Sequence, residues 1–267
     1  MIRPKEINEL AARHQVRDTQ IEKEYVLTWL LYGIAQNSTL RNMLAFKGGT
    51  VLKKVYFEDY RFSEDLYFTL LDETVSNLTL QTEFEEVYTF AKEEANISMQ
   101  FKESNIHEKS GSLNFYVNYL GPLGGNLSSK DLKIDITRGE KMEFDSLLRS
   151  VIPGYSDLPP AGFELKCYSL AEVLIEKMVA LMGRLEPRDL YDFWYLTEME
   201  RLNPADYRME FASKARHKGH KPEQFPNKIL AKETALRKAW ETKLAHQMHD
   251  LPKFEDVFRQ ARRWLRF

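Results

Sequence analysis

Two adjoining segments constrain the fold of this chain more than any other feature of its sequence. Residues 46–56 read FKGGTVLKKVY and place two glycines at the start of an expected helix. Residues 61–68 read RFSEDLYF and carry Asp65 on an expected strand. Glycines let a ligand approach the backbone closely, helix starts attract anions, and carboxylate oxygens are preferred ligands of Mg²⁺. The two segments therefore predict a nucleotide phosphate held beside a divalent metal.

Tyr67 departs from this pattern. Residues 65 and 67 share one face of the expected strand, so a carboxylate at 67 would complete an acidic pair. The residue there is a tyrosine. A phenol with an ordinary pKa near ~10 is neutral at pH 7 and is a poor ligand for Mg²⁺. The strand thus keeps only one of the two carboxylates.

The bulk composition describes an ordinary globular protein without a membrane-spanning segment. The chain has 267 residues, of which 43% are hydrophobic and 29% charged. Its single cysteine, Cys167, excludes a disulfide within the chain and fits a reducing compartment. Its beginning lacks an apolar signal core, and no stretch approaches the length of a membrane span. We expect a cytoplasmic protein with no membrane association.

The charge is unevenly distributed along the chain. Residues 201–267 contain 16 Lys and Arg against 8 Asp and Glu, a net charge of +8. Because the whole chain carries −2, residues 1–200 carry −10. A basic arm beside an acidic body would favour a polyanionic substrate, with Lys214, Arg216 and Lys218 as candidate RNA contacts. The alternative is that these cations only solvate the outer faces of amphipathic helices.

Hydrophobic periodicity predicts a mixed α/β part followed by a helical part. The change is expected near residue 165, after a stretch rich in Pro and Gly, residues 138–166, that reads as irregular. Ser169 and Glu172 then have the spacing of a capping box at a helix start. The expected elements are helices over 21–36, 49–56 and 74–94, and strands over 66–71, 96–101, 113–119 and 131–137.

Two further groups of residues carry chemistry. Asp135 emerges on the polar face of the strand over 131–137, two residues from Lys133. Farther on, Asp189 and Asp192 share one face of a helix that begins near Pro187. Taken alone, the aspartates are typical of a first-turn charge pattern with a surface ion pair. Lys177, at the border of an apolar stripe, is by itself typical of a solvated lysine.

In combination, these segments resemble the AbiEii/AbiGii family of nucleotidyltransferase toxins, which includes related mycobacterial toxins. The shared features run from the KGGT turn through the RFSED and KID strands to Lys177 and the RDLYD helix, over roughly residues 20–200. The resemblance implies an α+β fold with a polymerase-β-like mixed-sheet body, followed by a helical C-terminal bundle. It also implies a nucleotidyltransferase body with N-terminal helices over 1–165, and a helical domain over 166–267 that completes the nucleotide site and carries the basic arm.

The same resemblance implies an activity and its partners. The enzyme would transfer nucleotides from an NTP to an RNA such as the tRNA acceptor end, with Mg²⁺ as cofactor. Its setting would be a toxin–antitoxin or abortive-infection system that acts in phage defence, with a cognate antitoxin encoded nearby. The positions that match the family's catalytic residues are Asp65, Asp135 and Lys177, of which Asp65 and Asp135 would hold the metal. The positions that match its nucleotide-binding residues are Gly48, Gly49, Thr50, Ser63, Lys177, Arg188, Asp189 and Asp192.

Within that family the strand reads Asp, apolar residue, Asp, so Tyr67 stands where the second metal ligand belongs. Three explanations are open: a degenerate homologue, a ligand supplied by Glu64 instead, or an introduced substitution. Lys47 and Arg61 would either assist the site or be surface cations. The leading hypothesis is a nucleotidyltransferase toxin with impaired catalysis. The alternative is an inactive homologue that binds a nucleotide, RNA or a protein partner.

Overall fold

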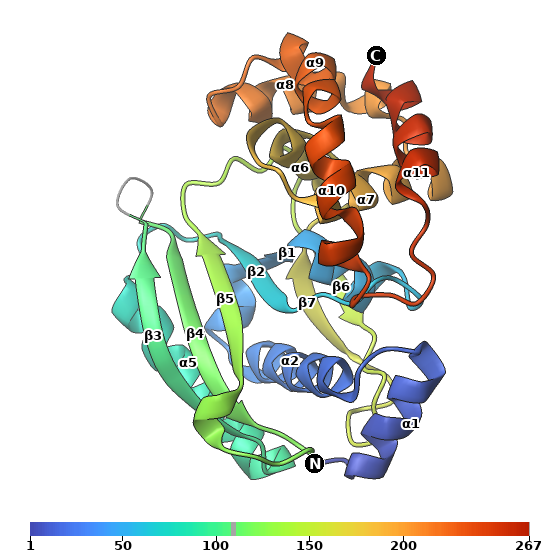
Figure 1. Ribbon diagram of the computed structural model, residues 1–267. Helices are drawn as coiled ribbons and strands as arrows, with labels where there is room; N and C mark the ends of the chain where they lie inside the picture. Colours follow the sequence, from blue (N-terminus) through green and yellow to red (C-terminus); the bar gives the residue numbers. More distant parts are fainter. Residues whose placement is uncertain (108–110, 267) are drawn as a thin grey trace. The chain divides into compact units, whose positions relative to one another are not determined.

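The protein forms two compact units, seen in a computed structural model that describes residues 1–107 and 111–266 (Figure 1). The sheet unit comprises residues 1–140 and 146–167, and the helical unit comprises residues 141–145 and 168–267. None of the described helices combines the length and the apolar character needed to span a membrane.

The sheet unit is built on a mixed seven-stranded sheet with the order β3-β4-β5-β2-β1-β7-β6 among the described residues. β2 runs parallel to β5, and β1 runs parallel to β7, whereas the other neighbouring pairs are antiparallel. The strands are β1 (Leu44–Lys47), β2 (Asp65–Leu70), β3 (Ser98–Ile106), β4 (Leu113–Leu120), β5 (Asp131–Thr137), β6 (Leu147–Val151) and β7 (Phe163–Cys167).

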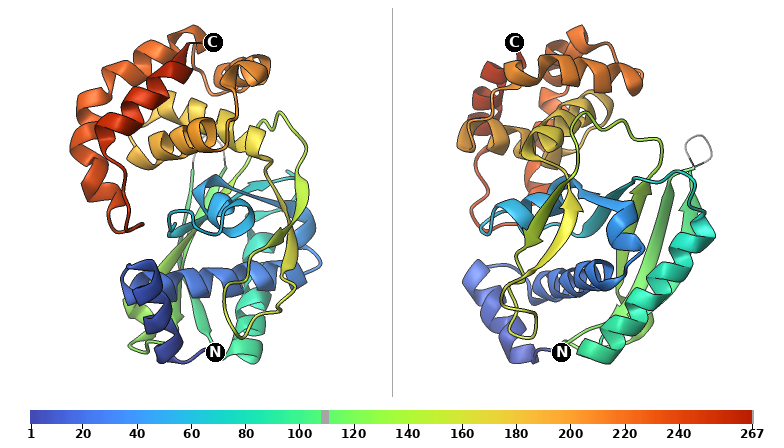
Figure 2. Two further views of the ribbon diagram at one scale, coloured as in Figure 1. Left: turned by 90° about the vertical axis from the view of Figure 1, so that its right-hand side faces the viewer. Right: turned by 180° about the vertical axis from the view of Figure 1, so that it is seen from behind.

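Helices α2 (Asp18–Gln36) and α5 (Asn77–Ala95) form the apolar layer of this unit. α2 is buried on nearly all sides, which explains why its sequence is apolar around the whole helix. It packs closely against α5, since a Cβ atom at Gly33 would lie 2.6 Å from Cγ1 of Val87. Figure 2 shows α5 along one face of β3 and β4, and α1 (Pro4–His14) packs against α2. The opposite, polar face of the sheet carries the candidate site, on β1, β2 and β5.

Several expected elements are confirmed, and others are corrected. The strand over 131–137 is confirmed as β5, and the helix near 49–56 is confirmed as α4 (Gly48–Val51) followed by a π-helical turn, η1 (Leu52–Tyr56). Residues 138–166 are not irregular throughout, because β6 forms there and β7 begins at Phe163. Phe163, Leu165 and Cys167 alternate with more exposed neighbours, a strand pattern that the nearby Pro and Gly residues obscured. The four-residue β1 was missed because it is buried on both faces and shows no alternation.

The remaining short elements connect these parts. In the sheet unit they are α3 (Leu40–Met43) and η2 (Leu127–Ser129). The helical unit consists of α6 (Leu170–Gly183), α7 (Pro187–Trp194), η3 (Tyr195–Met199), η4 (Pro204–Tyr207), α8 (Arg208–His217), η5 (Pro222–Gln224), α9 (Phe225–Ala231), α10 (Glu233–Leu244), α11 (Phe254–Ala261) and η6 (Arg262–Leu265).

The start of α6 differs from the expected capping box. Oγ of Ser169 accepts a hydrogen bond from the backbone N–H of Glu172 at 3.1 Å, as predicted. The Glu172 carboxylate does not complete the box, because it accepts the backbone N–H groups of Glu143 and Phe144, both at 2.9 Å. The ammonium group of Lys214 lies 2.7 Å from the same carboxylate and also donates to the carbonyl of Lys141 at 2.6 Å. These bonds tie the segment 141–145 to the helical unit.

Lys214 is therefore not a contact for RNA. Its side chain is 1% exposed and forms an ion pair with the carboxylate of Glu172. The assignment of Lys214 to a basic binding surface was wrong because a net count of charges along the chain does not distinguish buried cations from exposed ones. Arg216 and Lys218 are exposed, as expected.

Candidate functional site

The centre of the sheet brings three of the expected site residues to one polar face. In the strand register, Tyr67 of β2 lies opposite Lys47 of β1 on one side and opposite Asp135 of β5 on the other. Asp65, two residues before Tyr67, points to the same face and lies opposite Lys133. The intervening apolar residues of β2 and β5 are buried on the other face. Strand alternation and parallel pairing thus place Asp65, Tyr67 and Asp135 together.

The glycine turn after β1 is shaped around Tyr67. Gly48 has a φ of +81°, a conformation that L side chains rarely adopt. A Cβ atom at this position would lie 3.1 Å from Cδ2 of Tyr67, so the tyrosine ring packs directly against the turn. Position 48 therefore requires glycine for two reasons, one conformational and one steric.

Thr50 and Ser63 tie this turn to the start of β2. The Thr50 hydroxyl donates to the backbone carbonyl of Asp65 at 2.6 Å. It also shares a 2.7 Å hydrogen bond with the hydroxyl of Ser63. Both hydroxyls are buried, so in this structure they fix the turn relative to Asp65. The sequence predicted these residues as a group, and the structure places them side by side.

Each carboxylate on the polar face already has a neighbouring donor. The hydroxyl of Tyr67 donates to Oδ2 of Asp65 at 2.9 Å. The ammonium group of Lys133 lies 3.7 Å from Oδ2 of Asp135. Tyr67 therefore does more than omit a ligand, because its proton occupies one oxygen of the carboxylate that remains.

The polar face offers a small set of donors to the metal that the resemblance implies. Among the described residues, no group of three or more His, Cys, Asp or Glu side chains is arranged to hold a metal ion. Mg²⁺ is commonly bound by one or two carboxylates together with substrate phosphates. Asp65 and Asp135 fit that pattern for one ion bound with a nucleotide. They do not fit a pair of ions, which needs a further carboxylate where the chain has Tyr67.

Glu64 does not take the place of the missing ligand. It precedes β2, and its carboxylate lies 3.4 Å from the ammonium group of Lys23 on α2. That partner belongs to the helix layer on the other side of the sheet, which is the direction that strand alternation gives to residue 64.

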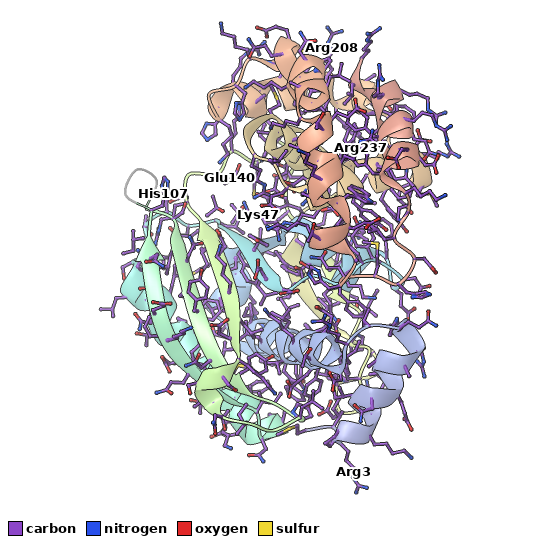
Figure 3. The ribbon with its side chains drawn as sticks, viewed as in Figure 1. Arg3, Lys47, His107, Glu140, Arg208 and Arg237 are labelled. Atoms are coloured by element: carbon purple, nitrogen blue, oxygen red, sulfur yellow. The ribbon has the colours of Figure 1, made fainter. Side chains whose placement is uncertain are left out.

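Lys47 and Arg61 are not simple surface cations. Nζ of Lys47 lies 3.5 Å from Oε2 of Glu140, and both residues are labelled in Figure 3. Arg61 is buried, lies over the ring of Tyr60 and donates to the carbonyl of Phe62 at 3.3 Å. The ion pair of Lys47 connects the end of β1 to the residues that follow β5.

The helical unit gathers a second group of expected residues into a buried ion-pair network. Nζ of Lys177 on α6 lies 3.0 Å from Oδ1 of Asp189 and 2.8 Å from Oδ2 of Asp192 on α7. Arg184 binds Asp189 with both ends of its guanidinium group, at 2.6 and 3.0 Å. The aspartate side chains are 0% exposed, and Lys177 is almost as buried. The expectation of a surface ion pair and a solvated lysine was therefore wrong.

The electrostatics of Asp189 follow from these contacts. Burial alone would raise its pKa, but Lys177 and Arg184 outweigh burial and hold the pKa below its ordinary value. The carboxylate is thus ionised, and the network fixes the packing of α7 against α6. Arg188, half-buried, follows Pro187 in the first turn of α7.

Sequence reasoning missed one residue beside the site. Asn114 of β4 lies directly opposite Asp135 in the antiparallel register of β4 and β5. It faces the polar side because Leu113 and Phe115, its neighbours along the strand, are buried. The alternation in β4 could have indicated its face, but only the register identifies its neighbour.

Comparison with known proteins identifies the family of this chain. The family profile described as the nucleotidyl transferase AbiEii toxin of type IV toxin–antitoxin systems matches residues 29–261. Comparison with curated proteins gave no match. Among solved structures, JHP933 from Helicobacter pylori is similar with a TM-score of 0.58 and 17% identity, over 94% of this chain and 91% of that chain. MenT4, a nucleotidyltransferase toxin from Mycobacterium tuberculosis H37Rv, is similar with a TM-score of 0.61 and 15% identity, over 99% of this chain and 90% of that chain.

The two similar structures support the fold, and the family profile shows the family. The α+β, polymerase-β-like fold with a mixed sheet and a helical C-terminal part is confirmed. The profile covers most of the chain, including every expected site residue. This chain therefore belongs to the AbiEii family of nucleotidyltransferase toxins from type IV toxin–antitoxin systems.

Proposed function

We propose that this protein transfers a nucleoside monophosphate from an NTP to a hydroxyl group of RNA, with the tRNA acceptor end as the substrate. The observation that carries the proposal is the grouping of Asp65, Tyr67 and Asp135 on one sheet face beside the Gly48 turn. In the reaction, the RNA hydroxyl oxygen bonds to the α-phosphorus, the bond to the β-phosphate oxygen breaks, and pyrophosphate leaves. Such a transfer depends on positioning the phosphates and neutralising their charge.

Residues of both units have roles in this proposal. The backbone at Gly48, Gly49 and Thr50 would approach the triphosphate, with Ser63 holding the turn. Asp65 and Asp135 would hold one Mg²⁺, which when bound neutralises charge on the phosphoryl oxygens. Asp135 would also accept the proton of the attacking hydroxyl. The contribution of the helical domain to the nucleotide site would come from Lys177, Arg188, Asp189 and Asp192.

The buried network limits what Lys177 can do. Two carboxylates already lie against its single positive charge, so we propose that it acts on the triphosphate only together with Asp189 and Asp192. Arg188, the neighbour of Asp189 on α7, would be a further cation that contacts the nucleotide.

We further propose that Tyr67 keeps the rate low in this form of the protein. Its hydroxyl donates to Oδ2 of Asp65, one of the two residues that would hold the metal, and its ring packs against Gly48. The biological setting would be a cytoplasmic toxin–antitoxin pair that halts growth during phage infection. A cognate antitoxin is the implied protein partner.

The test is incorporation of each radiolabelled NTP into total tRNA by the wild type, Tyr67→Asp and Tyr67→Phe. We expect Tyr67→Asp to raise incorporation at least severalfold, because it restores a carboxylate on the face that holds Asp65. Tyr67→Phe removes the hydrogen bond without adding a ligand, so it should change incorporation much less. If Tyr67→Asp gives no gain while a related active toxin labels the same tRNA, the proposal is wrong.

The hydrogen bond between Tyr67 and Asp65 also favours a second candidate function. A family member whose carboxylate is occupied by a phenol would retain NTP or RNA binding without turnover. In that case calorimetry would detect NTP binding by the wild type, and the wild type would incorporate no label. Incorporation of label by the wild type itself would exclude this second function.

A further inference from the structure

A pocket of about 420 Å³ lies in the helical unit, along α8. Three arginines line it: Arg208 and Arg216 from α8, and Arg266 from the end of the described chain. Arg208 is labelled in Figure 3. Its single acidic lining residue is Glu223, and none of its lining residues is a catalytic candidate. The lining thus carries a net charge of +2, from three arginines and one glutamate.

Among the described residues, the three arginines lack the ion pairs that several other arginines of the same unit make. Arg237, Arg259 and Arg263 each lie within 4 Å of a carboxylate, at 3.1, 2.7 and 3.5 Å from Glu233, Asp256 and Glu198 respectively. By contrast, Arg208, Arg216 and Arg266 are exposed and have no ion-pair partner within residues 1–107 and 111–266. Like charges gathered without counter-charges repel one another, so such a cluster costs stability unless an anion binds to it.

The shape of the pocket indicates the kind of anion. Arg208 and Arg216 are eight residues apart on one helix, which is about 12 Å along its axis. Between them the floor is apolar, since Phe211 and Phe225 are 2% and 1% exposed and pack edge to face at 5.1 Å. A ligand that fits must therefore be elongated, with negative charges at intervals and a flat apolar part between them. Guanidinium groups also match the geometry of phosphate oxygens.

An RNA strand has these properties, and an acidic peptide matches them less well. In RNA, phosphates alternate with bases and sugars that can lie over an apolar floor. An acidic peptide carries its charges on flexible side chains and has no flat group to cover Phe211. The net charge of +8 on residues 201–267 would also attract a polyanion over a longer range.

We propose that the pocket formed by Arg208, Arg216 and Arg266 binds the phosphate backbone of the RNA substrate. The inference rests on the proposed function for the choice of RNA as the ligand. It assigns to these arginines an anchoring role that is independent of the chemistry at Asp65 and Asp135. Arg216, named above as a candidate for RNA contact, thereby gains two partners that the sequence did not suggest.

The test measures RNA binding without turnover. A fluorescently labelled tRNA transcript is titrated with the full-length protein, and anisotropy is recorded at several salt concentrations without NTP. The pocket variant is Arg208→Gln with Arg216→Gln and Arg266→Gln. The matched control is Arg237→Gln with Arg259→Gln and Arg263→Gln, which removes the same charge from the same unit. Circular dichroism confirms that both variants are folded.

We expect the pocket variant to bind tRNA at least about tenfold more weakly than the wild type, and the control variant to stay within about threefold. The slope of the logarithm of the binding constant against the logarithm of the salt concentration should become less negative by about 2 to 3, because three phosphate contacts are lost. Equal losses in both variants, or no loss in the pocket variant, would overturn the inference. So would arginine-dependent binding of poly-glutamate together with unchanged binding of tRNA, because the partner would then be an acidic protein.

These outcomes are distinguishable from failure of the proposed reaction. If Tyr67→Asp transfers no nucleotide but tRNA binding depends on the three arginines, the reaction is wrong and the RNA site stands. If nucleotide transfer occurs but binding does not depend on the three arginines, only the RNA site is wrong.

Discussion

Replacing Lys177 by Met tests whether the buried network stabilises the helical unit. The change removes the cation that lies between two aspartates, each of which is 0% exposed. Asp189 retains the two hydrogen bonds from Arg184, whereas Asp192 loses the Lys177 ion pair. Breaking a buried ion pair by removing one partner typically costs about 3–5 kcal/mol, because a buried charge is left uncompensated.

The assay is equilibrium unfolding in urea, followed by circular dichroism at pH 7. With a slope near ~2 kcal/mol per molar urea, a loss of about 3–5 kcal/mol lowers the midpoint by about 1.5–2.5 M. Lys238→Met is the matched control, since Lys238 is an exposed lysine of α10 in the same unit. The control should change the free energy of unfolding by no more than about 0.5 kcal/mol.

A second substitution separates loss of charge balance from loss of packing. Lys177→Met combined with Asp192→Asn removes a buried negative charge together with the cation that lay against it, so we expect the double variant to recover about 1–2 kcal/mol of the lost free energy of unfolding. If Lys177→Met costs no more than Lys238→Met, or if the double variant recovers nothing, the network does not have the stabilising role that its geometry indicates.

Three further predictions concern single positions. Gly48→Ala should lower the free energy of unfolding by at least about 1–2 kcal/mol and weaken NTP binding in calorimetry, because Gly48 has a φ of +81° and a new Cβ would lie 3.1 Å from Tyr67. The control is Gly124→Ala, which has a φ of +69° and no atom within 4 Å of the new Cβ, so it measures the conformational cost alone. Equal losses in the two variants would contradict a steric contribution at position 48. The pKa of Asp189 is lowered in the folded protein, so its contribution to stability is present above the ordinary pKa near ~3.9 and is lost as the pH falls through the folded-state pKa. In urea unfolding, Asp189→Asn should therefore lose less stability than the wild type between about pH 5 and pH 2. Parallel curves of unfolding free energy against pH would refute this. Ser169→Ala should lower the free energy of unfolding by about 1 kcal/mol, because the N-cap hydrogen bond of α6 is lost. Ser169→Thr keeps the hydroxyl oxygen and should lower it clearly less. Identical losses would show that the cap is not the cause.

The sequence predicted the parts of the fold that depend on local pattern. β5 was predicted because Leu132, Ile134 and Ile136 alternate with polar residues, and the helix after the glycine turn was predicted from Gly49 onward, one residue after its observed start. The same alternation correctly put Asp65 and Tyr67 on one face of β2. Local pattern failed for β1 and β6. A short central strand has no exposed face, and β6 is an edge strand that is mostly exposed and shows no alternation.

The candidate site shows the same division. By itself, the sequence determined which residue types are present: the glycine turn, the carboxylates at 65 and 135, and the tyrosine where a second strand carboxylate belongs. Only the tertiary structure decided that the Tyr67 hydroxyl binds Asp65, that Lys177 is neutralised by two aspartates, and that Lys214 is buried. The reason is physical: periodicity fixes the face to which a side chain points, whereas its partner, and with it the charge that remains available, depends on strand register and helix packing between residues distant in sequence.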